Sequence, residues 1–460
     1  MPLPRAPPCA TTSCTPGSYA RPTPTCEPRD PTTLRDPGTR DRPATRRHPR
    51  APPRPSPSPD ADAVLRRPSW FVSVAVATLL SHAVLSGVRT LISYRVLALG
   101  GDGVDVGVIT AVFAILPLVV ALRIGRAVDR GLAVPALRLG LGLTVVAVLL
   151  AAMSSNLAIL GVASATLGLA QMLHTVACQS MVALWSPPDR MDGRFGHLTL
   201  SVSAGQLLGF PIAGLVATLT THGSGVVSTG PALFVMGAIA AAAVPLAFVF
   251  APGDTKRVSQ SDAVDGQQST FRLLATPGMK PAMYSSLTVL TAMDLLMAYL
   301  PVLGQTMGLS VATVTALLTG RTVTSVISRA AMPILLRRIP RRWLLVSATL
   351  VSGVPMALIP FTSAVVPLML AMLLMGFFWG VGQPLTMSWV TLIADSRNRA
   401  AALSVRLAGN RIGQVTVPIA AGALSGLIGV GAIFHASGLL LISSGLLTLT
   451  ATVNMRPDSG

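Results

Sequence analysis

The residues best suited to chemistry are charged side chains embedded in long apolar stretches. Asp294 is the only carboxylate inside any of these stretches. A charge at the centre of a bilayer costs at least about 2.5–3.5 kcal/mol on insertion scales, so such a residue faces a cavity or a partner. Two interpretations of Asp294 follow: it binds and releases a proton or cation, or it is the structural partner of an arginine.

Arginines outnumber acids in the apolar stretches of the second half of the chain. Arg321 and Arg411 lie well inside two of them, and a guanidinium suits the recognition of carboxylate or phosphate. Asn410 and Gln414 flank Arg411 and could add hydrogen bonds to a substrate. The sequence therefore predicts recognition of an anionic group, or else pairing of these arginines with backbone carbonyls or Asp294.

The positions of two further arginines in the second half favour a structural role for them. Arg329 and Arg406 lie nearer the ends of their apolar stretches, where a long side chain can reach the membrane surface. In the first half, Arg89 lies toward the end of the first apolar stretch. It is a candidate for substrate binding or coupling.

Uncharged polar residues complete the candidates. His82 and His174 could carry a proton near neutral pH, although a lone membrane histidine more often serves packing through a hydrogen bond. Gln179 and Gln383 occupy the fourth and tenth apolar stretches, which correspond in the two halves. We expect both glutamines to line a cavity.

The composition shows what kind of elements must position these residues. The chain has 460 residues, of which 51% are hydrophobic and 11% are charged. A soluble domain is usually about 25% charged. The composition excludes an ordinary soluble enzyme and a mostly disordered protein, and favours a membrane protein that crosses the bilayer many times.

Twelve apolar runs follow residue 69, each long enough to form a membrane helix, which takes about 20 residues. The predicted spans are 70–92, 106–124, 132–153, 157–184, 197–221, 230–251, 281–303, 310–336, 343–362, 364–392, 400–427 and 430–452. The fold class is therefore an all-α membrane protein with two six-helix bundles.

Charges in the connections predict the orientation. The formal net charge is +18, and Lys and Arg gather in every second connection between the runs. The connection at 101–105 carries Asp102 and Asp105 instead. Because Lys and Arg are retained on the cytoplasmic side, we expect both termini to be cytoplasmic.

The composition also divides the chain into four segments. Residues 1–67 are rich in Pro and Arg and should be disordered, because they cannot bury enough apolar area. An alternative is that this tail is a mis-assigned start and that translation begins near Val64. We expect six-helix bundles at 68–251 and 281–460, joined by a cytoplasmic loop at 252–280.

Several classes of site are missing from the sequence. There is no G-x-x-x-x-G-K-[ST] phosphate loop and no H-E-x-x-H motif. The four cysteines, Cys9, Cys14, Cys26 and Cys178, form no C-x-x-C pair. We expect no metal, no cofactor, no enzymatic activity and no nucleic-acid partner.

The connection after the second run carries a recognisable motif. Gly125, Asp129 and Arg130 match the G-x-x-x-D-R part of the signature of the major facilitator superfamily, whose later Gly-Arg-Arg is absent. The sequence thus resembles this family. The resemblance implies twelve helices and a role for these residues in holding the cytoplasmic ends of the halves together.

The fifth run resembles the glycine motif of the exporters of this family. Gly205, Gly209 and Gly214 keep its spacing, as does Gly196, and Pro211 is displaced by one position. Small residues let helices approach closely, as a flexing interface requires. The second half resembles bacterial efflux-type members. The arginine that proton-coupled drug exporters carry in the fourth helix is missing here.

These observations favour a secondary transporter in the cell (plasma or inner) membrane that works by alternating access. Its expected partners are the lipid bilayer, a small organic substrate and protons, with proton-coupled efflux as the favoured activity. One alternative is uptake or facilitated transport of an anionic metabolite. An alternative of another class is a membrane receptor or scaffold that keeps the fold without transporting.

Overall fold

A computed structural model of the chain describes residues 69–221, 227–250, 275–276, 278–393 and 399–450. The first half consists of α2 Ser69–Ala98, α3 Gly103–Ala127, η1 Val128–Leu132, α4 Ala133–Ala152, α5 Leu157–Trp185, α6 Pro188–Thr220, α7 Thr229–Ala243 and η2 Val244–Val249. The second half consists of α9 Met279–Thr306, α10 Val311–Arg338, α11 Arg341–Leu358, η3 Ile359–Phe361, α12 Val365–Ile393, α13 Arg399–Ile428 and α14 Gly431–Thr450. The expected tail at 1–67 and most of the central loop lie outside the described residues.

The predicted membrane spans are confirmed. Within the described residues, 12 helical segments are long and apolar enough to cross a membrane, one for each predicted run. Several boundaries differ from the prediction. The first run continues to Ala98 rather than ending at 92. The fifth run begins at Pro188 rather than 197, because proline is well suited to the first turn of a helix. The sixth run tightens into a 3₁₀ segment at Val244, directly before a proline.

Local sequence explains where several helices begin. Asp102 and Asp105, which separate the first two spans, form a capping box: the Asp102 carboxylate accepts from the backbone of Val104 and Asp105, and Asp105 accepts from the backbone of Asp102. Asn156 caps α5 through its side-chain oxygen. These side chains satisfy backbone N–H groups that the first turn leaves unpaired.

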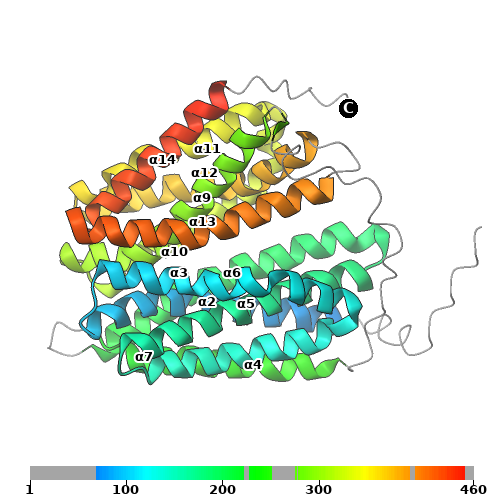
Figure 1. Cartoon of the computed structure of the whole chain (residues 1–460), viewed down its shortest axis with the longest axis horizontal. Coiled ribbons are helices and arrows are strands. Elements are labelled where there is room, and N and C mark those ends of the chain that lie inside the picture. The colour runs from blue at the N-terminus through cyan, green and yellow to red at the C-terminus, as the bar shows by residue number, and fades with distance from the viewer. Residues whose placement is uncertain (1–68, 222–226, 251–274, 277, 394–398, 451–460) are drawn as a thin grey trace, which may run out of the picture. The chain divides into compact units, whose positions relative to one another are not determined.

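The twelve helices form two bundles of six (Figure 1). In the first bundle α2 packs on α6, and α4 packs on α5. In the second, α11 packs on α14, and α10 packs on α12. The bundles meet where α3 packs on α13 and α6 packs on α10. Helices are favoured because a membrane leaves backbone groups no partner outside their own segment.

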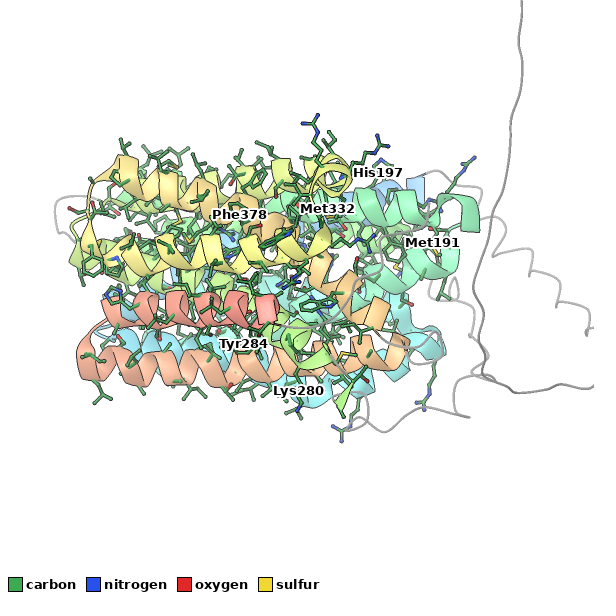
Figure 2. All side chains as sticks on the ribbon, turned by 90° about the horizontal axis from the view of Figure 1, so that it is seen from above. Met191, His197, Lys280, Tyr284, Met332 and Phe378 are labelled. Carbon is green, nitrogen blue, oxygen red and sulfur yellow. The ribbon has the colours of Figure 1, made fainter. Side chains whose placement is uncertain are left out.

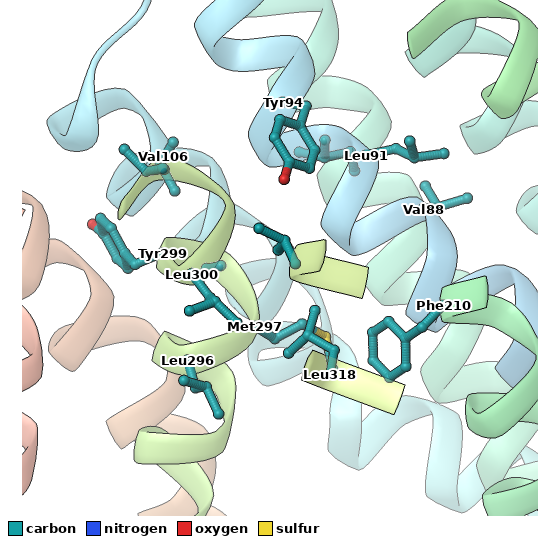
Figure 3. Packing of buried hydrophobic residues seen from close by; sticks show 14 of the residues in the cluster. Val88, Leu91, Tyr94, Val106, Phe210, Leu296, Met297, Tyr299, Leu300 and Leu318 are labelled. Atoms are coloured by element: carbon teal, nitrogen blue, oxygen red, sulfur yellow. The ribbon is translucent and has the colours of Figure 1, made fainter. Parts of the chain in front are cut away.

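The largest hydrophobic cluster contains residues of both bundles. Figure 3 shows Val106 and Phe210 of the first bundle together with Met297, Tyr299 and Leu318 of the second. All five are less than 10% exposed. The interface between the bundles therefore contains packed core as well as polar residues.

The outer surface of the bundles is apolar. Large hydrophobic side chains such as Val119, Leu139, Leu215 and Leu439 are more than half exposed. A soluble protein rarely exposes so many large apolar groups together, whereas a lipid-facing surface requires them. Figure 2 shows side chains projecting along the length of the helices, with Lys280 at the lower edge of the view.

The bundles approach closely at the end where α3 begins and α13 ends, which is the predicted outer end. A Cβ atom at Gly107 of α3 would lie 2.5 Å from the carbonyl oxygen of Pro418 and 2.6 Å from the hydroxyl of Tyr299. The Tyr299 hydroxyl donates to the carbonyl of Gly103 at 3.0 Å. Gly214 of α6 meets Thr315 of α10 just as closely. The structure is thus closed at this end.

We expect Gly107→Val to weaken this closure, because the new side chain collides with backbone of the other bundle. The check is a Ser93→Cys substitution in a background without native cysteines, labelled from outside by a membrane-impermeant thiol reagent. Ser93 is buried beside α3. The labelling rate should rise at least about tenfold, which corresponds to a closed state that is less stable by about 1.4 kcal/mol.

The control for this experiment is Gly142→Val, because a Cβ at Gly142 meets nothing within 4 Å. This variant should label like the parent. Equal labelling of the Gly107 and Gly142 variants would contradict the assignment of Gly107 to the closure.

Candidate functional site

An ion pair connects the two bundles near the middle of their helices. Arg89 Nη1 of α2 donates to Asp294 Oδ1 of α9 at 2.7 Å. The two side chains are 14% and 12% exposed, so both charges are largely withdrawn from solvent. This pair joins two of the candidates that the sequence indicates.

The pair continues into the second bundle. Gln414 Nε2 of α13 donates to the other oxygen of Asp294 at 2.8 Å. Arg411 Nη1 donates in turn to Gln414 Oε1 at 3.0 Å. Four predicted site residues, Arg89, Asp294, Gln414 and Arg411, therefore form one chain of polar contacts.

A small cavity lies beside Arg89. It has a volume of about 20 Å³ and is lined by residues that include Arg89, Ser93, Thr110 and Ser164. Such a volume suffices for about one water molecule. The Arg89 guanidinium also stacks on the Phe113 ring, with 4.8 Å from Cζ to the ring centroid. Arg89 therefore contacts an aromatic face as well as a carboxylate.

Arg321 lies in α10 within the second bundle and is 3% exposed. Its Nε and Nη1 atoms are buried and have no hydrogen-bond partner. The Cζ atom lies 6.0 Å from the centroid of Trp379 in α12. The structure does not pair Arg321 with Asp294, which is one of the partners that the structural interpretation of the sequence offers.

Arg329 and Arg406 of the second bundle turn inward. Arg329 donates to the Gly380 carbonyl at 3.3 Å and to the Ser203 hydroxyl of the first bundle at 3.1 Å. Arg406 is 8% exposed and donates to Gln383 Oε1 at 3.1 Å. Their helix-end positions favour contact with the membrane surface, but the structure gives both side chains interior partners.

Asn410 is separate from the chain of contacts around Asp294. It is 5% exposed and exchanges hydrogen bonds with the Ser286 hydroxyl at 3.1 and 3.2 Å. Its neighbour Arg411 faces Gln414 instead. Adjacent residues of a helix point in different directions, so Asn410 joins α13 to α9 at another position.

The two candidate histidines come together in the first bundle. His82 of α2 and His174 of α5 have ring centroids 6.2 Å apart. His82 Nδ1 lies 3.0 Å from the Thr78 carbonyl, and its Nε2 lies 3.0 Å from Gln171 Nε2. The carbonyl requires a donor and the amide an acceptor, which corresponds to a neutral His82 with its proton on Nδ1. Cys178, 3.6 Å from His174, is a free buried cysteine.

Gln179 is exposed, and it follows Gln171 and Thr175 at successive four-residue spacings on one face of α5. Gln171 contacts both His82 and Thr175. The cavity-lining role of Gln179 stays a prediction.

The residues of the predicted gating motif lie at the junction of α3 and α4. The segment Val128–Leu132 is π-helical, and Gly131 there has φ of 96°, a conformation that favours glycine. Arg130 is exposed, and a Cβ at Gly125 would meet nothing within 4 Å. The contacts of the Asp129 side chain lie outside the described part of the structure.

The glycines of the fifth run serve two different contacts. Gly205 and Gly209 press against the backbone of α2 in their own bundle, and only Gly214 of these three faces the other bundle. Pro211 lies inside α6. The glycine spacing therefore fixes packing within the first bundle as much as it shapes the interface.

Several polar residues at these sites do not stand out in the sequence. Ser203, Gln171 and Tyr299 each contact a candidate residue or the other bundle. A glutamine within an apolar run could have drawn attention to Gln171. Serine is too common in membrane helices to give such a signal, and a tyrosine there is usually read as packing or interfacial anchoring.

Comparison with known proteins places this arrangement in a family. The family model described as Major Facilitator Superfamily matches residues 74–320 and 282–460. No curated protein sequence matches the chain significantly.

Among solved structures, a variant of the nucleoside transporter NupG matches with a TM-score of 0.69 and 14% identity, covering 84% of this chain and 100% of that chain. An inward-facing, occupied bacterial homolog of the human lysosomal transporter Spinster matches with a TM-score of 0.64 and 14% identity, covering 86% of this chain and 97% of that one. A POT family transporter in complex with a thioalcohol-conjugated peptide matches with a TM-score of 0.67 and 13% identity, covering 82% of this chain and 95% of that one.

At these identities the structural likeness concerns the fold. The family model covers most of the chain, and the twelve helices in two bundles agree with it. The chain is a multi-pass membrane protein that belongs to the Major Facilitator Superfamily.

Proposed function

We propose that this protein is a proton-coupled transporter that exports a small organic molecule across the cell membrane by alternating access. The observation that carries the proposal is the Arg89–Asp294 ion pair between the two bundles. A carboxylate in this position can exchange its ionic partner for a proton. Alternating access requires such a bond to form and break as the bundles rock.

The coupling step follows from the charges of the pair. Ionised Asp294 attracts Arg89 across the interface at 2.7 Å and favours the closed approach of α2 and α9. A proton on Asp294 removes that attraction and makes separation of the bundles less costly. Protonation and conformation are then linked, because each state of the carboxyl group favours a different arrangement of the bundles.

Two observations support export. The glycine spacing around Gly205, Gly209 and Gly214 resembles that of exporters in the family, and all three glycines lie at tight helix crossings. We also propose that Gly125, Asp129 and Arg130 gate the transporter by holding the two halves together at the predicted cytoplasmic end. The structural neighbours are named for nucleoside, lysosomal and peptide-bound transporters, so they do not narrow the substrate.

The test is proton movement in energised inverted membrane vesicles, followed with a pH-sensitive dye while a panel of candidate compounds is added. We expect at least one compound to release protons from vesicles that contain the protein, and none to do so in vesicles without it. A correctly inserted protein that moves neither protons nor labelled compounds would contradict the proposal and favour a receptor or scaffold.

A further inference from the structure

We infer that Arg321 is the binding residue for an oxyanion, a carboxylate or phosphate group carried by an organic substrate of this transporter. The inference rests on the proposed transport function and names its substrate class. Arg321 as a whole is 3% exposed, and the Nε and Nη1 atoms of its guanidinium are buried without a partner. A buried charge without a partner is costly, so a residue kept in this state points to a ligand.

The position of Arg321 is fixed by its surroundings. A Cβ at Gly376 of α12 would collide with the Arg321 carbonyl, so α10 and α12 cross closely at this point. The Trp379 ring lies on one side of the guanidinium, and its indole nitrogen donates to the Ser352 hydroxyl at 2.9 Å. The arginine is therefore prearranged, which lowers the entropic cost of binding.

The nearby acid does not neutralise this charge. Asp294 lies within electrostatic range of Arg321 but is already bound by Arg89 and Gln414. Arg329, also within range, adds a second positive charge. The region thus has a surplus of positive charge that an anionic ligand would offset.

Other buried N–H donors of the second bundle also lack a partner. Gln383 Nε2 and Arg406 Nε are buried and unpartnered, as is the indole nitrogen of Trp389. All three are N–H groups of α12 or α13, and the described structure gives none of them a hydrogen-bond acceptor.

Trp379 adds a preference for the rest of the ligand. An aromatic face beside a guanidinium favours a flat, apolar group next to the anion. Benzoate and phenyl phosphate are therefore suitable probes, and benzamide is the neutral control of the same shape. Phosphatidylcholine nanodiscs contain no lipid with a net negative charge that would compete with the probes.

The experiment measures equilibrium binding of labelled benzoate and phenyl phosphate to the full chain in these nanodiscs. We expect saturable binding at millimolar concentrations that benzamide does not displace. Arg321→Gln should weaken it at least about tenfold, as expected for loss of a charged hydrogen bond. Arg338→Gln, an exposed arginine of the same helix, should bind like wild type. The tighter probe identifies carboxylate or phosphate as the preferred group.

Stability separates this role from a structural one. If Arg321 serves to bind a ligand, the melting temperature of ligand-free Arg321→Met should equal or exceed that of wild type. The substitution removes a buried charge that has no partner. A clear fall in the melting temperature of Arg321→Met would overturn the inference. Failure of wild type to bind either anion, or equal binding by Arg321→Gln, would also overturn it. Binding is read without a proton gradient, so failure here is distinct from failure of proton coupling.

Discussion

Asp294→Asn is expected to reduce compound-driven proton release to the level of vesicles that lack the protein. The amide keeps the shape of the carboxyl group, and its oxygen can still accept a hydrogen bond from Arg89 or Gln414, which now lie 2.7 and 2.8 Å from the carboxylate oxygens. Unlike a carboxyl group, the amide cannot ionise by releasing a proton or become neutral by binding one. The measurement is dye recovery in energised inverted vesicles, with the amount of inserted protein matched to wild type.

A second readout separates coupling from folding. Because asparagine mimics the protonated side chain, Asp294→Asn should still exchange labelled for unlabelled compound without a gradient. The matched control is Asp105→Asn, the same change in the capping box at the start of α3, which should release protons like wild type. Normal proton release by Asp294→Asn would exclude this carboxylate from the coupling path.

The second large effect is expected from breaking the ion pair while leaving one charge in place. Arg89→Met removes the cation and leaves a buried carboxylate, 12% exposed, with Gln414 as its remaining partner. Removing one member of a buried pair costs about 3–5 kcal/mol, because the other charge stays desolvated without compensation. We expect the same order of loss for Asp294→Leu.

The double variant Arg89→Met/Asp294→Leu should recover most of this stability, because it leaves neither charge buried. The measurement is thermal unfolding of the purified protein and its three variants as a double-mutant cycle. Arg337→Met, an exposed arginine at the end of α10, should unfold like wild type. Additive losses in the double variant would mean that the two residues are not energetically coupled. The recovered variant should nonetheless be inactive in the proton-release assay.

These results would also bear on the two alternatives to proton-coupled export. An anion carrier without proton coupling would show substrate flux in wild type and in Asp294→Asn, and compound-driven proton release in neither. A receptor or scaffold would show no flux in any variant. Substrate flux and proton release, measured together in wild type and Asp294→Asn, therefore distinguish the three functions even while the chemical identity of the substrate is open.

The order, length and class of the helices follow from the sequence. Each apolar run must become a helix because a bilayer offers no partners for unpaired backbone groups. Asp102 and Asp105 could also have been recognised as a capping box, because a cap depends on residues within one turn. The depth of Asp294, Arg89 and Arg321 along their helices was likewise predictable.

Only the tertiary structure decided which of these residues meet. Asp294 pairs with Arg89, 205 positions away, and not with Arg321. Asn410 turns to Ser286 while Arg411 turns to Gln414. Apolar run length gives the depth of a residue, but the direction of its side chain depends on how each helix is rotated in its bundle. That rotation is set by packing between segments distant in sequence, such as Gly205 and Gly209 against α2. A single sequence does not reveal this packing.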